Sequence, residues 1–307
     1  MLTIQQDQTI VLETGGSKPV YAIVFHPNRK HLLCGGGDGI RRWRLSDGQE
    51  VGRQTGMHVY ALSASRDRQW IACGTTKGAS VWDRELHEKL IDVEGRNWVD
   101  AVDISPDSTR LATGTDKHEV SIWSITTGKR LVGPLPHDRS VIGTRFSPNG
   151  EHIATATYGG LLRVFGSRNG DALVTIDTTT PAHSLSTPLE WSSDGRRIFA
   201  TSYNKKIKSF DASTGSQLAE LQIPSHSLAL APNSKFIATC TDHSISFLDA
   251  STLARTGPVI PESGRIYSIA ISQDNGYLAT GQVDGKTVIR NLSKILPDLY
   301  GPFDVSI

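Results

Sequence analysis

The chain has 307 residues, and its 32 Lys and Arg against 31 Asp and Glu leave a formal net charge of +1. This balance gives no overall field that would favour nucleic acid or an anionic membrane, so neither is expected as a partner. The sequence lacks an apolar run of about 18 residues, which a membrane-spanning helix would need. Its first residues, MLTIQQDQTIVLETGG, lack the basic and apolar regions of a secretory signal.

Cysteine usage indicates an intracellular protein. The three cysteines, Cys34, Cys73 and Cys240, are odd in number and far apart, which argues against a disulfide framework or a zinc site. Each lies in an apolar segment. We interpret them as buried free thiols in a reducing compartment, either cytoplasmic or nuclear.

One unit recurs along almost the whole chain. In each unit a β-rich run ends at a turn and a second apolar run follows directly, as in RFSPNGEHIATAT (Arg145–Thr157). The Asn or Asp of this turn recurs every 39 to 45 residues. We call these residues the turn anchors; they are Asn28, Asp67, Asp107, Asn149, Asp194, Asn233 and Asp274.

Each unit contains four short segments of strand character, divided by tight turns. In the third unit they are Val99–Ile104, Arg110–Thr115, Val120–Ile125 and Arg130–Leu135. A four-stranded antiparallel sheet repeated about every 40 residues predicts an all-β fold, a seven-bladed β-propeller of four-stranded antiparallel blades. The expected blades are about 16–55, 56–95, 96–136, 137–181, 182–223, 224–262 and 263–292, in one domain of residues 1–307.

The repeated unit resembles the WD40 repeat. The second strands read LLCGG, IACGT, LATGT, IATAT, FATSY, IATCT and LATGQ, and the third strand of unit two ends in the pair Trp82-Asp83. The resemblance covers roughly residues 9–292 and implies the propeller fold. His137 alone occupies the family's Gly-His position, so no unit has the full Asp-His-Ser/Thr-Trp network. We therefore expect the blades to depend on apolar packing between neighbours.

The ring is expected to close through an N-terminal strand. Unit seven stops after Thr287–Leu292, and Pro297 and Pro302 make the following segment a poor strand. The alternating stretch Gln8–Gly15 can supply the missing outer strand of blade seven and remove an exposed edge. The tail 293–307 would then pack outside the ring as a helical turn, with Leu296, Leu299, Tyr300 and Phe303 against the propeller.

Motifs for catalysis are weak or absent in the sequence. GQVDGKT (Gly281–Thr287) has one residue too few for a Walker A loop and lies in an expected hairpin turn. A metal or carboxylate site in the channel would need acids on several innermost strands, and only Asp100 and Glu190 stand out. Asp103 is expected to face a neighbouring turn. We therefore predict a protein that is not an enzyme, with no catalytic, cofactor-binding or metal-binding residues and no cofactor.

Two basic clusters are interpreted as solvated faces rather than as phosphate sites. They are RRWR (Arg41–Arg44) and NKKIK (Asn204–Lys208), and both fall in expected strands and turns.

Aromatic residues gather at one rim of the expected ring. Equivalent positions of successive blades form rings, and five of the seven tyrosines fall at positions that open on the rim. Tyr and Trp dominate interface hot spots, and acids among them suit a partner that bears Lys or Arg. The other reading is that the tyrosines only fill the mouth of the channel. The candidate partner-binding residues are Tyr21, His58, Tyr60, Trp98, Asp100, Asp116, Tyr158, Tyr203, His226, Arg265 and Tyr267.

Three classes of function remain at this stage. The first is a non-catalytic scaffold or adaptor that binds a protein or peptide at this rim, as a monomeric propeller within a larger complex. The second is a ligand-sensing C-terminal propeller of a larger nucleotide-binding receptor, since the short divergent units also resemble the C-terminal propellers of fungal receptors of that kind. The third and most distant is a propeller enzyme with a site in the central channel.

Overall fold

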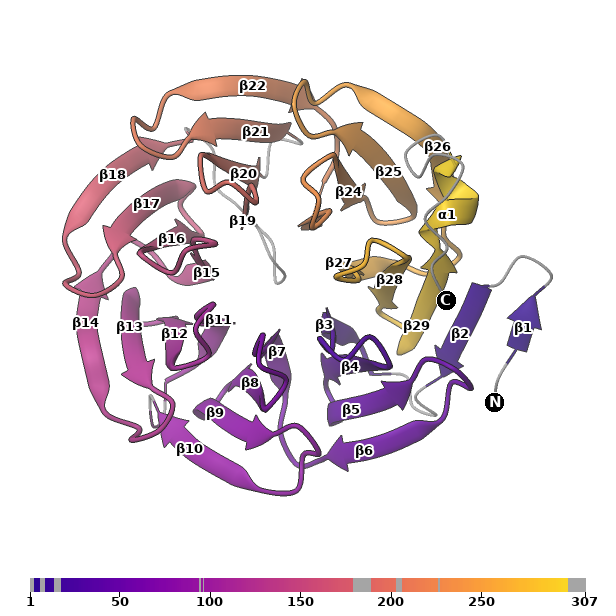
Figure 1. Cartoon of the computed structure of the whole chain (residues 1–307), viewed down its shortest axis with the longest axis horizontal. Helices are drawn as coiled ribbons and strands as arrows, with labels where there is room; N and C mark the ends of the chain where they lie inside the picture. The colour runs from indigo at the N-terminus through magenta and orange to yellow at the C-terminus, as the bar shows by residue number, and fades with distance from the viewer. Residues whose placement is uncertain are drawn as a thin grey trace.

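The computed structural model forms a ring of seven sheets around a central channel (Figure 1). It describes residues 3–5, 9–13, 18–93, 95, 97–178, 189–202, 206–225 and 227–297. The predicted seven-bladed propeller is confirmed. Within the described part of the chain no helix is long and apolar enough to cross a membrane.

Blades one to three follow one another along the chain as four-stranded antiparallel meanders. Blade one contains β3 (Val20–Phe25), β4 (His31–Gly36), β5 (Gly39–Arg44) and β6 (Glu50–Gln54). Blade two contains β7 (Val59–Ala64), β8 (Trp70–Thr75), β9 (Gly78–Asp83) and β10 (Lys89–Val93). Blade three contains β11 (Val99–Ile104), β12 (Arg110–Thr115), β13 (Glu119–Ser124) and β14 (Arg130–Pro136). In each, the first strand lies against the channel and the fourth lies on the circumference (Figure 1).

Blades four to six repeat this order. Blade four contains β15 (Val141–Phe146), β16 (His152–Thr157), β17 (Leu161–Gly166) and β18 (Ala172–Asp177). Blade five contains β19 (Leu189–Trp191), β20 (Arg197–Ser202), β21 (Lys206–Asp211) and β22 (Gln217–Gln222). Blade six contains β23 (Ser227–Leu230), β24 (Phe236–Cys240), β25 (Ser244–Asp249) and β26 (Arg255–Pro261).

Blade seven is closed by the N-terminal strand, as predicted. It contains β27 (Ile266–Ile271), β28 (Tyr277–Gln282) and β29 (Lys286–Asn291), and β2 (Thr9–Glu13) pairs antiparallel with β29. The register places Ile10 opposite Ile289 and Leu12 opposite Thr287. A short strand β1 (Thr3–Gln5) pairs outside β2 and makes this sheet five-stranded, which the sequence analysis did not predict.

The segment after blade seven begins with a helical turn. Helix α1 (Leu292–Ile295) starts at Asn291, whose side chain accepts a hydrogen bond from the Ser293 amide. Leu292 and Leu296 are buried among apolar residues of blades six and seven. The other predicted contact residues of the tail, Leu299, Tyr300 and Phe303, lie outside the described residues.

The apolar core lies between the blades. Each cluster of buried apolar side chains in the described residues spans two neighbouring blades, as where Ile40 of blade one meets Leu62 and Trp82 of blade two. Leu12 of the closing strand joins the cluster between blades seven and one. Burial of apolar surface between neighbours stabilises the ring as a whole. Cys34, Cys73 and Cys240 are buried free thiols, as expected.

The turn anchors lie on one face of the ring, where their side chains satisfy the local backbone. In five blades a serine hydroxyl donates to the anchor at 2.5–2.6 Å and accepts the amide of the residue five positions later at 2.8–3.0 Å. These serines are Ser65, Ser105, Ser147, Ser192 and Ser272. The structure thus explains the recurring turn as a self-contained hydrogen-bond motif. We call this side of the ring the turn-anchor face and the opposite side the rim face.

The polar networks inside the blades depart from the family pattern in different ways. In blade four, His137 Nε2 lies 2.9 Å from Thr155 Oγ1, but Phe165 stands where the pattern has Trp. In blade seven, buried Glu262 occupies the position equivalent to His137, and it binds Arg290 at the Trp position with 2.5 Å between Oε1 and Nη1. An ion pair thus stands at the two positions where the family pattern has His and Trp.

The interpretation of the two basic clusters as solvated faces was wrong in part. In NKKIK, Lys208 is buried and donates to the Thr178 carbonyl at 3.2 Å. Arg41 and Arg42 of RRWR are buried rather than solvated. Arg41 pairs with Glu50 at 3.1 Å and with Asp38 at 3.3 Å. Arg42 pairs with Glu85 of blade two and donates to the Arg84 carbonyl at 2.6 Å. Both side chains therefore bind within the propeller, and Arg42 links two blades.

Candidate functional site at the mouth of the central channel

The repeat places equivalent residues of the innermost strands in rings around the channel. The ring seven positions before the turn anchors lies at the rim face, and its described members are Tyr21, Tyr60, Asp100, Ile142 and Tyr267. The ring four positions before the anchors lies deeper and consists of Val24, Ser63, Asp103, Arg145, Glu190, Ala229 and Ala270. The first ring contains most of the aromatic side chains, whereas the second is charged on one side of the channel and small or apolar on the other.

Four aromatic side chains form a continuous stacked series across blades seven, one, two and three. The centroid of the Tyr21 ring lies 5.5 Å from that of Tyr267 and 5.1 Å from that of Tyr60, with interplanar angles of 27° and 26°. The Trp98 ring continues the series, 5.0 Å from Tyr60 and tilted by 49°. These separations are those of favourable offset stacking. We call Tyr267, Tyr21, Tyr60 and Trp98 the aromatic arc.

Charged residues hold the two ends of the arc. At blade seven the guanidinium carbon of Arg265 lies 5.5 Å from the Tyr267 ring centroid, and its Nε donates to Asp242 at 2.6 Å. At blade three Asp116 accepts the Trp98 amide at 3.1 Å, and the Asp116 amide donates back to the Trp98 carbonyl at 3.0 Å. Trp98 is therefore fixed through its backbone, while its side chain remains 39% exposed.

Asp100 lies beside the arc and is partly buried. It follows Trp98 by two residues and lines a cavity together with Tyr60. Burial and, to a smaller extent, the neighbouring charge of Asp116 together raise the pKa of its carboxyl to about 6. A carboxylate in this state is stabilised by any cation that approaches it.

The remaining predicted rim residues are not part of the aromatic arc. Tyr158 lies in the turn between β16 and β17, 43% exposed, and its amide donates to the Ser140 carbonyl. His58 is exposed just before β7. Tyr203 and His226 lie outside the described residues.

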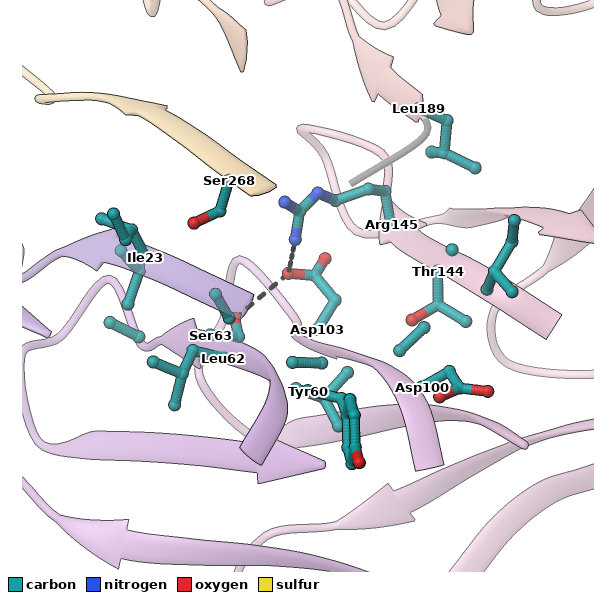
Figure 2. Close-up of a pocket in the computed structure, with 18 of the residues that line it drawn as sticks. Ile23, Tyr60, Leu62, Ser63, Asp100, Asp103, Thr144, Arg145, Leu189 and Ser268 are labelled. Carbon is teal, nitrogen blue, oxygen red and sulfur yellow. Dashed lines mark hydrogen bonds and ion pairs between the residues drawn. The ribbon is translucent and has the colours of Figure 1, made fainter. Parts of the chain in front are cut away.

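The deeper ring contains an ionic cluster that the sequence analysis missed. Arg145 donates to Asp103 at 3.3 Å (Figure 2). It also donates to Glu190 at 3.3 Å and so joins blades three, four and five across the channel wall. Burial favours the neutral form of Arg145, but Glu190 and Asp103 raise its pKa and keep it charged. Asp103 also accepts the Ser63 hydroxyl at 3.2 Å and the Phe146 amide at 2.8 Å. The expectation that Asp103 faces a turn was therefore wrong, because the side chain points into the channel.

A cavity of about 210 Å³ lies between the two rings. Its wall includes Tyr60 and Asp100 near the rim and Asp103 and Arg145 deeper in the channel (Figure 2). The residues that line it come from the innermost strands of six blades. Tyr21 and Tyr60 were found as the residues seven positions before their turn anchors. The same comparison at four positions before the anchors would have placed Arg145 in the channel. In the described residues no group of three His, Cys, Asp or Glu side chains could hold a metal ion.

The sequence profile of the family described as "WD domain, G-beta repeat" matches residues 7–40, 88–124 and 255–290. The first match begins in the segment of the closing strand and ends in blade one. This chain is a WD40-repeat propeller. The sequence similarity and the ring of seven blades agree on that assignment.

Similar proteins include two that are named as subunits of initiation factors. The chain is 27% identical to transcription initiation factor TFIID subunit 5 of Caenorhabditis elegans over 74% of its own length and 36% of that protein. It is 23% identical to periodic tryptophan protein 2 of Arabidopsis thaliana over 74% of its length and 27% of that protein. It is 29% identical to eukaryotic translation initiation factor 3 subunit I of Scheffersomyces stipitis, over 47% and 45% of the two chains. The chain thus spans about a third of the length of the first two relatives.

A solved structure supports the fold. The β-propeller domain of Cps50 (Swd1) from Myceliophteria thermophila superposes with a TM-score of 0.78 at 16% sequence identity. The match covers 91% of this chain and 98% of that domain. At this identity the similarity shows the propeller architecture alone.

Proposed function

We propose that this WD40-repeat propeller is a non-catalytic scaffold that binds a protein or peptide partner on its rim face. The observation that carries the proposal is the aromatic arc, in which four rings stack across four blades and Trp98 remains partly exposed. Rigid aromatic side chains provide a large contact area at a small cost in conformational entropy. The names of similar proteins as subunits of TFIID and of initiation factor 3 support a role within an assembly.

The partner should bear Lys or Arg next to an apolar segment. Asp100 lies beside the arc with a raised pKa, and an approaching cation would stabilise its ionised form. Tyrosine and tryptophan faces also attract cations. Arg265 already occupies such a position over Tyr267, which shows the geometry that a partner cation could adopt over Tyr60 or Trp98. Acidic partners lack this complementarity.

We also propose an intracellular location and a monomeric propeller inside a larger complex. Three buried free thiols support a reducing compartment. The relatives named as transcription and translation initiation factors support the same location.

Affinity purification with a matched pair of triple variants tests the scaffold function. Tyr60→Ala, Trp98→Ala and Tyr267→Ala together remove most of the arc. The control combines Leu131→Ala, Leu173→Ala and Leu218→Ala, which truncate three exposed leucines on the outer strands of neighbouring blades. Both proteins should remain folded by circular dichroism. Loss of the main partners from the arc variant alone supports the proposal, and retention of every partner by the arc variant refutes it.

A further inference from the structure

Blade two departs from the repeat where the connection from blade one meets the sheet. In blades four and seven the residue twelve positions before the turn anchor bonds to a threonine of the second strand, as His137 does to Thr155. Blade two has the exposed Thr55 at that position and Cys73 in place of the threonine. Cys73 bonds instead to Ser80 of the third strand, 3.2 Å away. A pairing between connection and strand is thus replaced in blade two by a pairing between two strands.

A cavity of about 550 Å³ opens at this place. Its wall runs from the connection between blades one and two, through the turn between β8 and β9, to the outer strand β10 on the circumference (Figure 1). A Cβ placed on Gly56, in the connection, would meet nothing within 4 Å, so the space beside it is open. The described lining residues include none of the aromatic arc. We call this cavity the blade-two groove; its wall includes Met57, Lys77, Trp82, Lys89 and Asp92.

The charged side chains of the groove leave one positive charge unbalanced. Lys89 pairs with Asp92 at 2.5 Å, and its Nζ lies 5.6 Å from the centroid of the Trp82 ring. Lys77, ten positions after its turn anchor, is exposed and forms no ion pair with any other described residue. Blade one has Asp38 at the equivalent position, so the charge of this turn is reversed in blade two. The groove therefore attracts an anionic group.

The rest of the wall is largely apolar and opens at two places. Met57 is half-buried, and the Trp82 ring and the stem of Lys89 lie near it in the same wall. His58 in the connection and Asp92 on the outer strand are both exposed, so the groove is open toward the rim face and toward the circumference. Its volume equals roughly eighteen water molecules, which is more than one side chain fills. An extended segment of chain can therefore cross it.

We propose that the blade-two groove binds a short extended segment of a partner protein in which an Asp or Glu side chain lies next to an apolar one. The carboxylate pairs with Lys77, which has no counter-ion of its own, and the apolar side chain packs against Met57. The site is separate from the aromatic arc and goes beyond the proposed function. A partner that reaches both sites would bring a basic segment to the arc and an acidic one to the groove.

Fluorine NMR of the full chain labelled with 5-fluorotryptophan tests the groove without any partner. The chain has six tryptophans, and the resonance of Trp82 is identified by its loss in Trp82→Phe, the residue that blade four has at this position as Phe165. N-acetyl-leucyl-glutamyl-leucine amide should shift this resonance saturably. Its glutaminyl analogue should bind about three- to fivefold more weakly, as expected for loss of a partly exposed ion pair. Equal binding of the two peptides, or an unmoved Trp82 resonance, would overturn the proposal.

A matched pair of lysine variants separates the groove from general attraction of anions. Lys77→Gln should lower the affinity for the glutamyl peptide to that of the glutaminyl one. Lys117 occupies the equivalent turn position of blade three, is also exposed and lies outside the groove, so Lys117→Gln should leave the affinity unchanged. Both lysines are exposed, and neither substitution is expected to alter folding. Equal losses in the two variants, or none in Lys77→Gln, would contradict the groove.

Two further titrations identify the occupant and separate this site from the arc. Hexanoate, a carboxylate on one alkyl chain, should bind at least about tenfold more weakly than the glutamyl peptide because it buries less apolar surface. Binding of hexanoate as tight as that of the peptide would contradict a protein segment and favour a free organic acid. The arc variant should bind the peptide within about twofold of the wild type, because the two sites share no residue. No peptide binding to the wild type, with loss of partners from the arc variant, would refute the groove and leave the scaffold function standing.

Discussion

The two faces of the propeller differ in how completely their polar side chains are hydrogen-bonded within the chain. On the turn-anchor face, serine hydroxyls and anchor side chains bond to one another and to the local backbone in five blades. On the rim face, the aromatic arc exposes Trp98, and Asp100 lines a cavity beside it. Groups satisfied within the chain stabilise the fold, whereas groups left open are available to a ligand. Departures from the repeat, rather than the repeat itself, therefore mark the candidate site.

The largest effect on stability is expected at Glu262, a carboxylate on the rim side of blade seven that is hydrogen-bonded within the chain. Glu262 is buried and accepts hydrogen bonds from Thr280, Gln282 and Arg290. Glu262→Ala leaves the Arg290 guanidinium without its counter-ion and should lower the free energy of unfolding by about 3–5 kcal/mol in urea denaturation. Asp242→Ala, which breaks the exposed Arg265–Asp242 pair, should change it by no more than about 1 kcal/mol. Similar losses in both variants would contradict the distinction between a buried and an exposed ion pair.

Removal of the Asp100 charge is expected to stabilise the protein, whereas removal of the Glu262 charge destabilises it. Its pKa in the folded protein is about 6, above the ordinary value of about 3.9, so the folded state loses stability as the pH rises from about 4 through 6. Asp100→Asn should therefore stabilise the protein by about 2–3 kcal/mol at pH 7 and by nothing measurable at pH 4. Denaturation curves at the two pH values check this. A destabilised Asp100→Asn protein at pH 7 would show that the carboxylate is a structural group.

His26, in the first turn of blade one, provides a test on the turn-anchor face. His26 stands where five blades have serine; its Nδ1 accepts the Asn28 amide at 3.2 Å, and its Nε2 is buried without a partner. Burial lowers the pKa of His26 to about 4, below the ordinary 6.5. The unfolded chain therefore binds the proton first, and the fold loses up to about 2 kcal/mol as the pH falls from 6.5 to 4.

The substitution His26→Ser should remove this part of the pH dependence, because the new hydroxyl can make the hydrogen bonds that Ser147 makes in blade four. Unfolding measured every half pH unit between 4 and 7 is the appropriate readout. An unchanged pH profile would show that His26 is protonated freely in the folded protein.

The periodic features of the fold could be predicted from the sequence. The turn anchors predicted the number of blades. The alternating stretch Gln8–Gly15 predicted the closing strand, which the structure places at Thr9–Glu13. The same spacing placed Tyr21, Tyr60 and Tyr267 on one ring, and the structure brings their side chains into contact. A repeat carries this information because each residue position has a fixed orientation relative to the ring.

Pairings between different blades could not be predicted in the same way. Arg145 meets Asp103 and Glu190 only when three blades are assembled, and Arg42 is buried because Glu85 of the next blade receives it. The pair Glu262–Arg290 was missed because neither residue resembles the His or Trp whose position it occupies.

Site-specific photo-crosslinking most directly tests the claim that the rim face binds the partner. One sample carries p-benzoylphenylalanine in place of Trp98, and a second carries it in place of Leu173 on the circumference, where the leucine is 51% exposed. Irradiation in cell extract should give covalent partner adducts from position 98 and none of comparable yield from position 173. Adducts from position 173 alone, or equal adducts from both, would contradict a binding site on the aromatic arc.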